Sequence, residues 1–155
     1  MPHPRLQRGA VVDTGLLAAR ILLQIGAPQL AAVLGREAEV SEDVWNCALV
    51  ALSGVRIYTT AFALAEAFGG IIERRWPYAV APAQVAVAQL NASGDLEEVA
   101  VDKTSVLPSG VGLVDGSLIA AAVATGVPLV TYDMGLWQFG RGLADVLTIY
   151  ELCGV

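Results

Sequence analysis

The sequence contains little histidine and little cysteine, and each shortage excludes a class of chemistry. The single histidine is His3, in a chain of 155 residues. It does not supply the base for a serine or cysteine nucleophile, and it does not make a histidine-rich metal site. Cys47 and Cys153 stand far apart, without the spacing of a zinc site. We expect both to be reduced core residues, because thiols of cytoplasmic proteins stay unpaired. Any chemistry is therefore expected to use carboxylates.

Charged residues are also scarce, at 15% of the chain against 55% hydrophobic residues. The longest uncharged stretches, 76–94 and 116–132, are interrupted by prolines, glycines or amides, so neither is a clean membrane span. The beginning of the chain lacks the apolar centre of a signal peptide. We expect a cytoplasmic protein whose apolar excess fills a core and the interface of a homodimer. The formal charge of −6 argues against a broad nucleic-acid-binding surface.

Short apolar runs alternate with segments of helical spacing along the chain. The predicted strands are residues 10–13, 56–59, 96–101, 127–132 and 145–151. The predicted helices are residues 14–35 (in two pieces meeting near 26–28), 42–52, 61–73, 82–94, 112–125 and a short helix or turn at 135–144. Strands without polar alternation, separated by helices, are typical of a parallel sheet covered on both faces. We predict a single-domain, three-layer α/β/α fold with a mostly parallel sheet of about five strands. Residues 1–9 are expected to form a flexible segment before a domain of residues 10–155.

Two acids stand where predicted strands end. Asp13 closes the first strand, and Asp133 directly follows the fourth. Ligands of open parallel sheets gather outside the carboxyl ends of the strands. If these two strands are neighbours, both carboxylates project at the same edge.

Two further acids interrupt apolar helices. Asp115 shares a helical stripe with Leu118 and Ile119, where an apolar residue is expected. Glu66 is the one charge in "TTAFALAEAFGGII". Each of the four acids alone has an ordinary explanation as a helix-terminal, turn or solvated charge. Together, the four acids interrupt four apolar segments, one acid in each, and this joint pattern indicates that they belong to one functional site.

The segments "VVDTGLL", "TTAFALAE" and "GLVDGSLIAAAVATGVPLVTYD" together resemble the PIN domain, a family of nuclease type. The family pattern is a strand ending in Asp, a Thr or Ser six residues before a helical Glu, a helix with an early Asp, and a strand closing in Thr-x-Asp. The matching residues, in chain order and within residues 10–150, are Asp13, Thr60, Glu66, Asp115, Thr131 and Asp133. The resemblance implies a parallel sheet flanked by helices and an enzyme that hydrolyses RNA with Mg²⁺ or Mn²⁺.

The resemblance also implies roles for these residues. Asp13, Asp115 and Asp133 would be metal ligands, direct or through water, and Glu66 a ligand or the positioner of the attacking water. All four acids would be catalytic, while Thr60 and Thr131 would orient carboxylates by donating hydrogen bonds. Crowded carboxylates repel one another, and a hard divalent cation with oxygen ligands removes that repulsion.

The sequence departs from the family pattern in two places. Gly15 stands where many relatives carry Asn, and Gly135 and Leu136 follow Asp133 where many carry another acid. Cations for RNA are few. Candidate contacts to the RNA backbone or bases, each also explained as an ordinary solvated or helix-terminal residue, are Arg74, Arg75, Trp76, Lys103, Arg141, Tyr132 and Trp137.

The size and single domain favour the toxin half of a toxin–antitoxin pair, with RNA as substrate and a small antitoxin protein as partner. Two alternatives remain open. One is a PIN-like module that binds RNA or protein without catalysis. The other is an aspartic protease, since "VVDTG" is similar to its active-site turn; that enzyme needs a second such turn and an all-β scaffold.

Overall fold

The five strands form one parallel sheet in the order β3-β2-β1-β4-β5. The computed structural model describes residues 3–102 and 111–155. The strands are β1 Ala10–Val12, β2 Ile57–Thr59, β3 Leu96–Glu98, β4 Leu129–Thr131 and β5 Val146–Thr148. Each neighbouring pair runs parallel. The predicted α/β fold with a parallel sheet of about five strands is confirmed.

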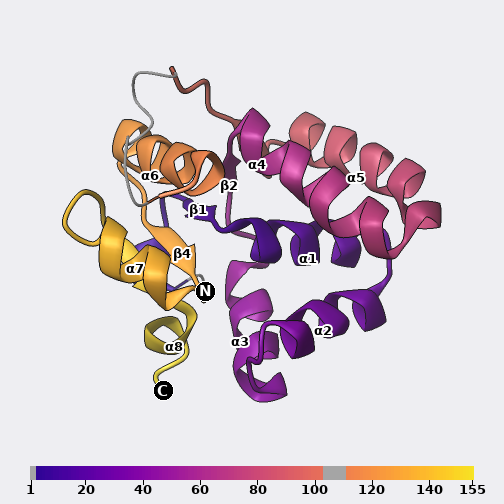
Figure 1. Cartoon of the computed structure of the whole chain (residues 1–155), viewed down its shortest axis with the longest axis horizontal. Coiled ribbons are helices and arrows are strands. Elements are labelled where there is room, and N and C mark those ends of the chain that lie inside the picture. Colours follow the sequence, from indigo (N-terminus) through magenta and orange to yellow (C-terminus); the bar gives the residue numbers. More distant parts are fainter. Residues whose placement is uncertain (1–2, 103–110) are drawn as a thin grey trace.

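Helices lie on both sides of this sheet, with α6 and α7 on one side of β1 and β4 and α1 to α3 on the other (Figure 1). The α-helices are α1 Thr14–Gln24, α2 Pro28–Glu37, α3 Glu42–Leu52, α4 Ala61–Ala65, α5 Val80–Ser93, α6 Leu113–Thr125, α7 Met134–Gly140 and α8 Ile149–Leu152. Shorter or irregular helices are η1 Pro4–Leu6, the π-helix η2 Glu66–Glu73 and η3 Pro77–Ala79. In the described part of the chain, none of the helices has both the length and the apolar character needed to cross a membrane.

The direction in which strands are added reverses between β1 and β4. From β1 the chain adds β2 and then β3 on one side, and it later adds β4 and β5 on the other. Helices that follow the two central strands therefore diverge to opposite faces of the sheet. A crevice opens outside the carboxyl ends of the strands at such a point, and this is where doubly wound sheets bind ligands.

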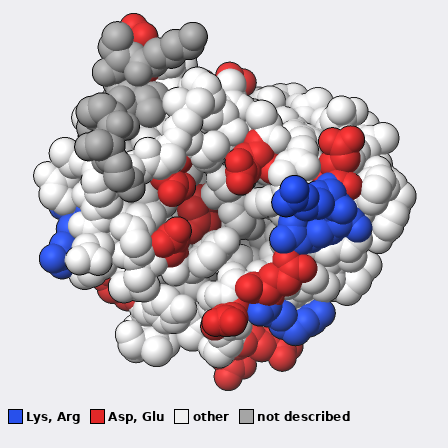
Figure 2. All heavy atoms as spheres, in the orientation of Figure 1, with Lys and Arg blue, Asp and Glu red and all other residues white. Residues whose placement is uncertain are grey.

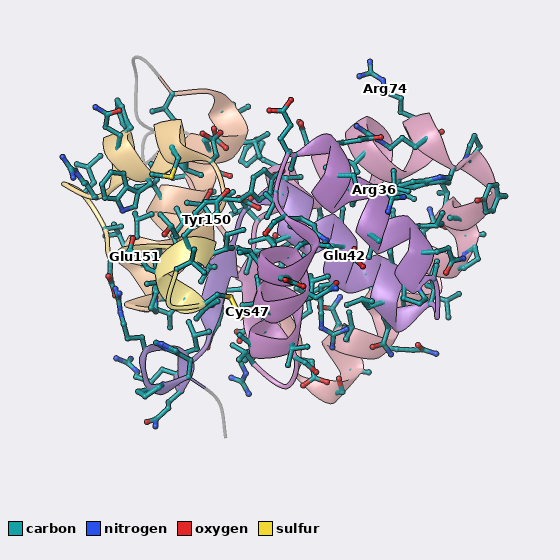
Figure 3. All side chains as sticks on the ribbon, turned by 90° about the horizontal axis from the view of Figure 1, so that it is seen from below. Arg36, Glu42, Cys47, Arg74, Tyr150 and Glu151 are labelled. Atoms are coloured by element: carbon teal, nitrogen blue, oxygen red, sulfur yellow. A yellow bond between two sulfur atoms is a disulfide. The ribbon has the colours of Figure 1, made fainter. Side chains whose placement is uncertain are left out.

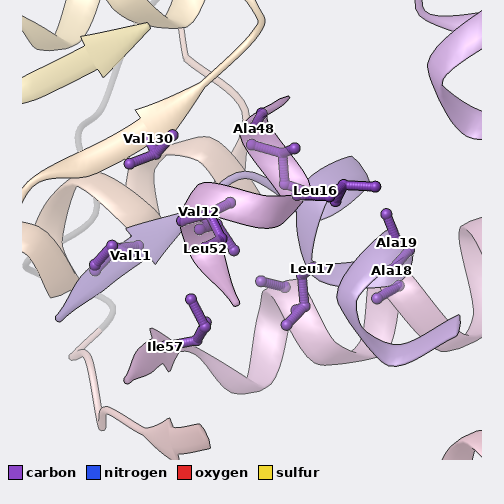
Figure 4. Close-up of a cluster of buried hydrophobic side chains, with 14 of the residues drawn as sticks. Val11, Val12, Leu16, Leu17, Ala18, Ala19, Ala48, Leu52, Ile57 and Val130 are labelled. Carbon is purple, nitrogen blue, oxygen red and sulfur yellow. The ribbon is translucent and has the colours of Figure 1, made fainter. Parts of the chain in front are cut away.

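Local signals account for most element boundaries. The Ser41 hydroxyl accepts a hydrogen bond from the Val44 N–H and caps α3, as the sequence predicts. Gly126 ends α6 in the left-handed conformation, with φ of 72°. The hydrophobic core then fixes the start of α1, because side chains of β1 and α1 pack together with Leu52 of α3 and Val130 of β4 (Figure 4). Asp13 lies in the sequence between the core residues Val12 and Leu16, so its backbone is held rigidly in place.

Several predicted boundaries differ from the structure, and three of the differences are informative. The strand expected at 145–151 ends at Thr148, because the Thr148 hydroxyl and the Glu151 carboxylate cap each other and start α8. The third strand ends at Glu98 rather than residue 101. The packed domain begins before residue 10, because Leu6 is 1% exposed and belongs to the core.

The two cysteines are joined, which corrects the expectation of free thiols. Cys47 of α3 and Cys153, just after α8, form a disulfide with 6.1 Å between their Cα atoms (Figure 3). They meet because α8, a helix in a segment that was expected to be a strand, packs against α3. The bond closes a loop with a sequence separation of 106 residues.

We predict that Cys153→Ser lowers the free energy of unfolding by about 2–4 kcal/mol, since a cross-link over a long loop restricts the unfolded chain. Urea titrations with and without dithiothreitol measure this. Reductant should destabilise the wild type by the same amount and leave the variant unchanged. Two titratable thiols in the unreduced wild type would contradict the pairing.

Candidate functional site

Four predicted acids line one hollow at the carboxyl edge of the sheet. Asp13 precedes α1, Glu66 begins η2, Asp115 lies in the first turn of α6, and Asp133 precedes α7. All four line a hollow of about 390 Å³. Figure 2 shows acidic side chains gathered between α4, α6 and α7, where the surface is hollowed. The structure therefore brings these acids together at the point where the strand order reverses.

Asp13 is held by three donors at the junction of β1 and β4. Its Oδ2 accepts from the Thr131 hydroxyl at 2.6 Å and from the Tyr132 N–H at 3.0 Å, and its Oδ1 accepts from the Leu16 N–H at 3.1 Å. The same Thr131 hydroxyl accepts from the Asp133 N–H at 2.9 Å. Thr131 thus orients one carboxylate, as predicted, and fixes the backbone of a second acid.

Burial makes the Asp13 carboxylate costly to ionise. The residue is 5% exposed. Burial raises the pKa of Asp13 from 3.8 to about 6, and the nearby Asp115 charge adds to the rise, although the Thr131, Leu16 and Tyr132 hydrogen bonds oppose it. A cation in the hollow would favour the ionised form.

The other acids are more open to solvent and lie within each other's fields. Partial burial raises the pKa of Asp115, and the charges of Asp133 and Glu66 raise it further. Asp133 Oδ1 accepts from the N–H groups of Gly135 and Leu136 at 2.8 and 3.2 Å. Its Oδ2 accepts no hydrogen bond from the described residues. Oxygen atoms therefore remain available for a ligand.

Contrary to the prediction, the Thr60 hydroxyl does not bond to a carboxylate of any described residue. Its hydroxyl oxygen accepts from the Ala63 N–H at 3.2 Å and lies 2.8 Å from Ser117 Oγ. Because the Ser117 hydroxyl donates to the Val114 carbonyl at 2.7 Å, Thr60 is the donor to Ser117. This buried chain links α4, which leads into Glu66, with α6, which carries Asp115.

Ser117 makes this link between the two helices and was not among the residues predicted from the sequence. The sequence signal for it is a hydroxyl in the otherwise apolar run after Asp115, and the structure buries that hydroxyl fully. A hydroxyl there bonds either its own helix or a neighbour. Glu66 has a signal of another kind, since the helix changes to π geometry at this residue, and π segments are frequent at functional sites.

Gly15 is required by Tyr132, because the space for a larger residue is already filled. A Cβ at Gly15 would lie 2.2 Å from the Tyr132 hydroxyl oxygen. The Tyr132 ring cannot simply retreat, because Trp45 packs edge-on against it with 5.6 Å between centroids. Burial and the charges of Asp13 and Asp133 raise the pKa of Tyr132, so its phenol stays protonated. The candidate base-stacking residue is thus a hydrogen-bond donor beside the acids.

The remaining candidates for RNA contact lie in different settings. Arg75 is paired with Glu37, and Arg141 stacks 4.5 Å over the Trp137 ring. Arg74 points away from the body of the molecule (Figure 3). Lys103 lies outside the described residues.

The donor set suits a hard cation, but it is not a tight preformed cage. Within residues 3–102 and 111–155, no three acidic, histidine or cysteine side chains are close enough to hold a metal ion. Mg²⁺ keeps several waters and is typically bound through one or two carboxylates. The four carboxylates that line the hollow supply oxygen donors of the kind that this ion prefers.

The aspartic protease alternative does not fit this architecture. Asp13, Thr14 and Gly15 cap and open a helix, and the sheet beneath them is parallel. That enzyme class requires an all-β scaffold. Neither the models of known protein families nor the curated proteins match the chain. The arrangement of its own residues is therefore the ground for assigning a function.

Without divalent cations, the free energy of unfolding should fall as the pH rises from about 4 to about 6. Folding favours protonated Asp13, so its contribution is complete below the unfolded pKa of 3.8 and is lost as the pH passes the folded pKa of about 6. The difference corresponds to about 3 kcal/mol. Urea titrations in EDTA across this range measure it. Asp13→Asn should flatten the profile, and an equally steep profile in that variant would exclude Asp13 as its source.

Proposed function

We propose that this chain is a metal-dependent ribonuclease of PIN type. The observation that carries the proposal is the convergence of Asp13, Glu66, Asp115 and Asp133 on one hollow at the reversal of strand order. The charges of Asp133 and Glu66 raise the pKa of Asp115, and the charge of Asp115 raises the pKa of Asp13. A divalent cation relieves that cost and gives the cluster a chemical purpose.

Each residue then has a defined task. Asp13, fixed by Thr131, would be the rigid ligand, while Asp115 and Asp133 would hold the cation directly or through water. The exposed Glu66 at the mouth of the hollow would position the attacking water. Bound Mg²⁺ or Mn²⁺ would supply water activation and charge stabilisation at a phosphodiester. The Thr60–Ser117 contact would keep Glu66 and Asp115 in register.

A non-catalytic binding module is the second candidate function. The observation that favours it is the lack of a close three-residue ligand set in the described part of the chain. Such a module would keep the fold and the groove but bind divalent ions no better than any acidic surface. Metal affinity therefore separates the two functions.

Wild-type protein should bind Mn²⁺ in calorimetry and cleave RNA with Mg²⁺ or Mn²⁺ but not in EDTA. Asp115→Asn and Asp133→Asn should each reduce cleavage by at least about a hundredfold and weaken Mn²⁺ binding. Asp43→Asn is the matched control, because Asp43 is an exposed acid on α3 outside the hollow. Cleavage that survives EDTA or both site variants would contradict the proposal, and a folded wild type without Mn²⁺ binding would favour the binding module.

We further propose that the enzyme is the toxin of a toxin–antitoxin pair. Two exposed apolar side chains lie at this site: Leu113, 53% exposed, lines the acidic hollow, and Phe139, 39% exposed, lines the hollow next to it. Apolar side chains at the edge of a site suit a protein partner, whether a small antitoxin or a second copy of the chain. Both partners are part of the toxin proposal.

Induced expression of the wild type alone should arrest bacterial growth, because uncontrolled cleavage of RNA stops protein synthesis. Asp115→Ala should relieve the arrest at equal protein level, which immunoblotting checks. Asp43→Ala should arrest growth as the wild type does. Harmless expression of the soluble wild type would contradict the toxin assignment but not the ribonuclease.

A further inference from the structure

The acidic hollow continues at both ends into neighbouring hollows. One, of about 540 Å³, shares Asp115, Asp133 and Leu136 with it. The other, of about 160 Å³, shares Gly15, Ile71 and Tyr132 with it and is also lined by Glu37 and Arg75. The three hollows therefore adjoin one another through these shared residues, and together they are called the groove. A polymer crossing the acids would therefore extend into the end that contains Arg75.

Arg75 is the one cation lining these three hollows among the described residues. Its Nε and Nη2 each lie 2.7 Å from Glu37 Oε2, and its Nη1 donates to the Ile71 carbonyl at 3.3 Å. A guanidinium has five N–H groups, so these contacts leave two unused. The Arg75 and Glu37 side chains are 32% and 45% exposed, and a pair this open is weak and exchangeable.

Tyr132 connects the arginine end of the groove with the acids. It lines both hollows. The positive charge of Arg75 lowers the pKa of its phenol, in opposition to the charges of the three aspartates of the acidic hollow. Its hydroxyl hydrogen bonds to no described residue. Gly15, by lacking a Cβ, leaves room for this hydroxyl. The phenol is thus held in place near a cation, and its O–H can donate a hydrogen bond to a ligand.

We propose that Arg75 and Tyr132 form a phosphate subsite that holds the RNA strand beside the reacting phosphodiester, and that Glu37 occupies Arg75 until that phosphate displaces it. The inference rests on the proposed ribonuclease function. Its physical reason is charge. A chain of net charge −6 with four acids in its groove repels RNA, so a local cation is needed to seat the strand. Glu37 keeps this cation paired when no strand is present.

Fluorescence anisotropy with a labelled single-stranded RNA in EDTA tests the subsite without cleavage. Arg75→Ala should weaken binding about tenfold and lower the slope of log affinity against log salt by about 0.7. Tyr132→Phe keeps the ring against Trp45 and should weaken binding about fivefold. Arg74→Ala is the matched control, because Arg74 is the adjacent arginine but points away from the body of the molecule and lines none of the three hollows.

Glu37→Gln is the sharper variant, because it should tighten binding about two- to fivefold. A merely structural ion pair would not give a gain. The gain should vanish when Arg75→Ala is added. Equal affinities of Arg75→Ala and Arg74→Ala, no gain from Glu37→Gln, or no measurable RNA binding by wild type and Glu37→Gln would each overturn the subsite.

Mn²⁺ calorimetry on the same proteins separates this inference from the proposed function. Arg75→Ala and Glu37→Gln should bind Mn²⁺ as the wild type does. If the wild type binds no Mn²⁺ while RNA affinity still depends on Arg75, the nuclease proposal fails and the phosphate subsite stands. If Mn²⁺ binds and RNA affinity ignores Arg75, the subsite alone fails.

Discussion

The parallel pairing of β1 with β4 is the constraint on which the candidate site depends. The register sets Val12 beside Val130, so Asp13 leaves its strand next to Thr131, which bonds both Asp13 and the backbone of Asp133. The helices beyond these strands diverge, which opens the groove that the carboxylates line. The burial of Asp13 and the neighbouring Asp115 charge raise the pKa of Asp13, so its ionised form costs free energy in the folded protein. The proposed divalent cation would offset that cost.

Features with a local cause could be predicted from the sequence. The apolar runs and caps gave the central strands and most helices, because each depends on residues a few positions apart. Asp13 and Asp133 could be placed at one edge, because parallel strands end on the same side of a sheet. Asp115 was found as a carboxylate within an apolar stripe. Asp13 is the most informative of these acids, because it is buried and burial of a charge is expensive without a partner.

Features that depend on tertiary contact could not be predicted. The partner of Thr60 is Ser117, on a helix 57 residues away in sequence. Cys47 and Cys153 meet only because α8 follows β5, where a local capping box overrides the β-rich composition of residues 145–151. The need for Gly15 in α1 comes from the hydroxyl of Tyr132, the residue that follows β4. Each of these contacts joins residues far apart in the sequence, so the pattern of residues within one segment does not predict it.

The central claim is that the four carboxylates share a divalent cation. Anomalous diffraction from crystals soaked with Mn²⁺ tests it most directly, because it locates the ion without assuming any activity. The account predicts a manganese peak in the hollow lined by Asp13, Asp115 and Asp133, with Glu66 at its mouth. A peak confined to other acids, such as those at the start of α3, or no peak at all, would contradict it.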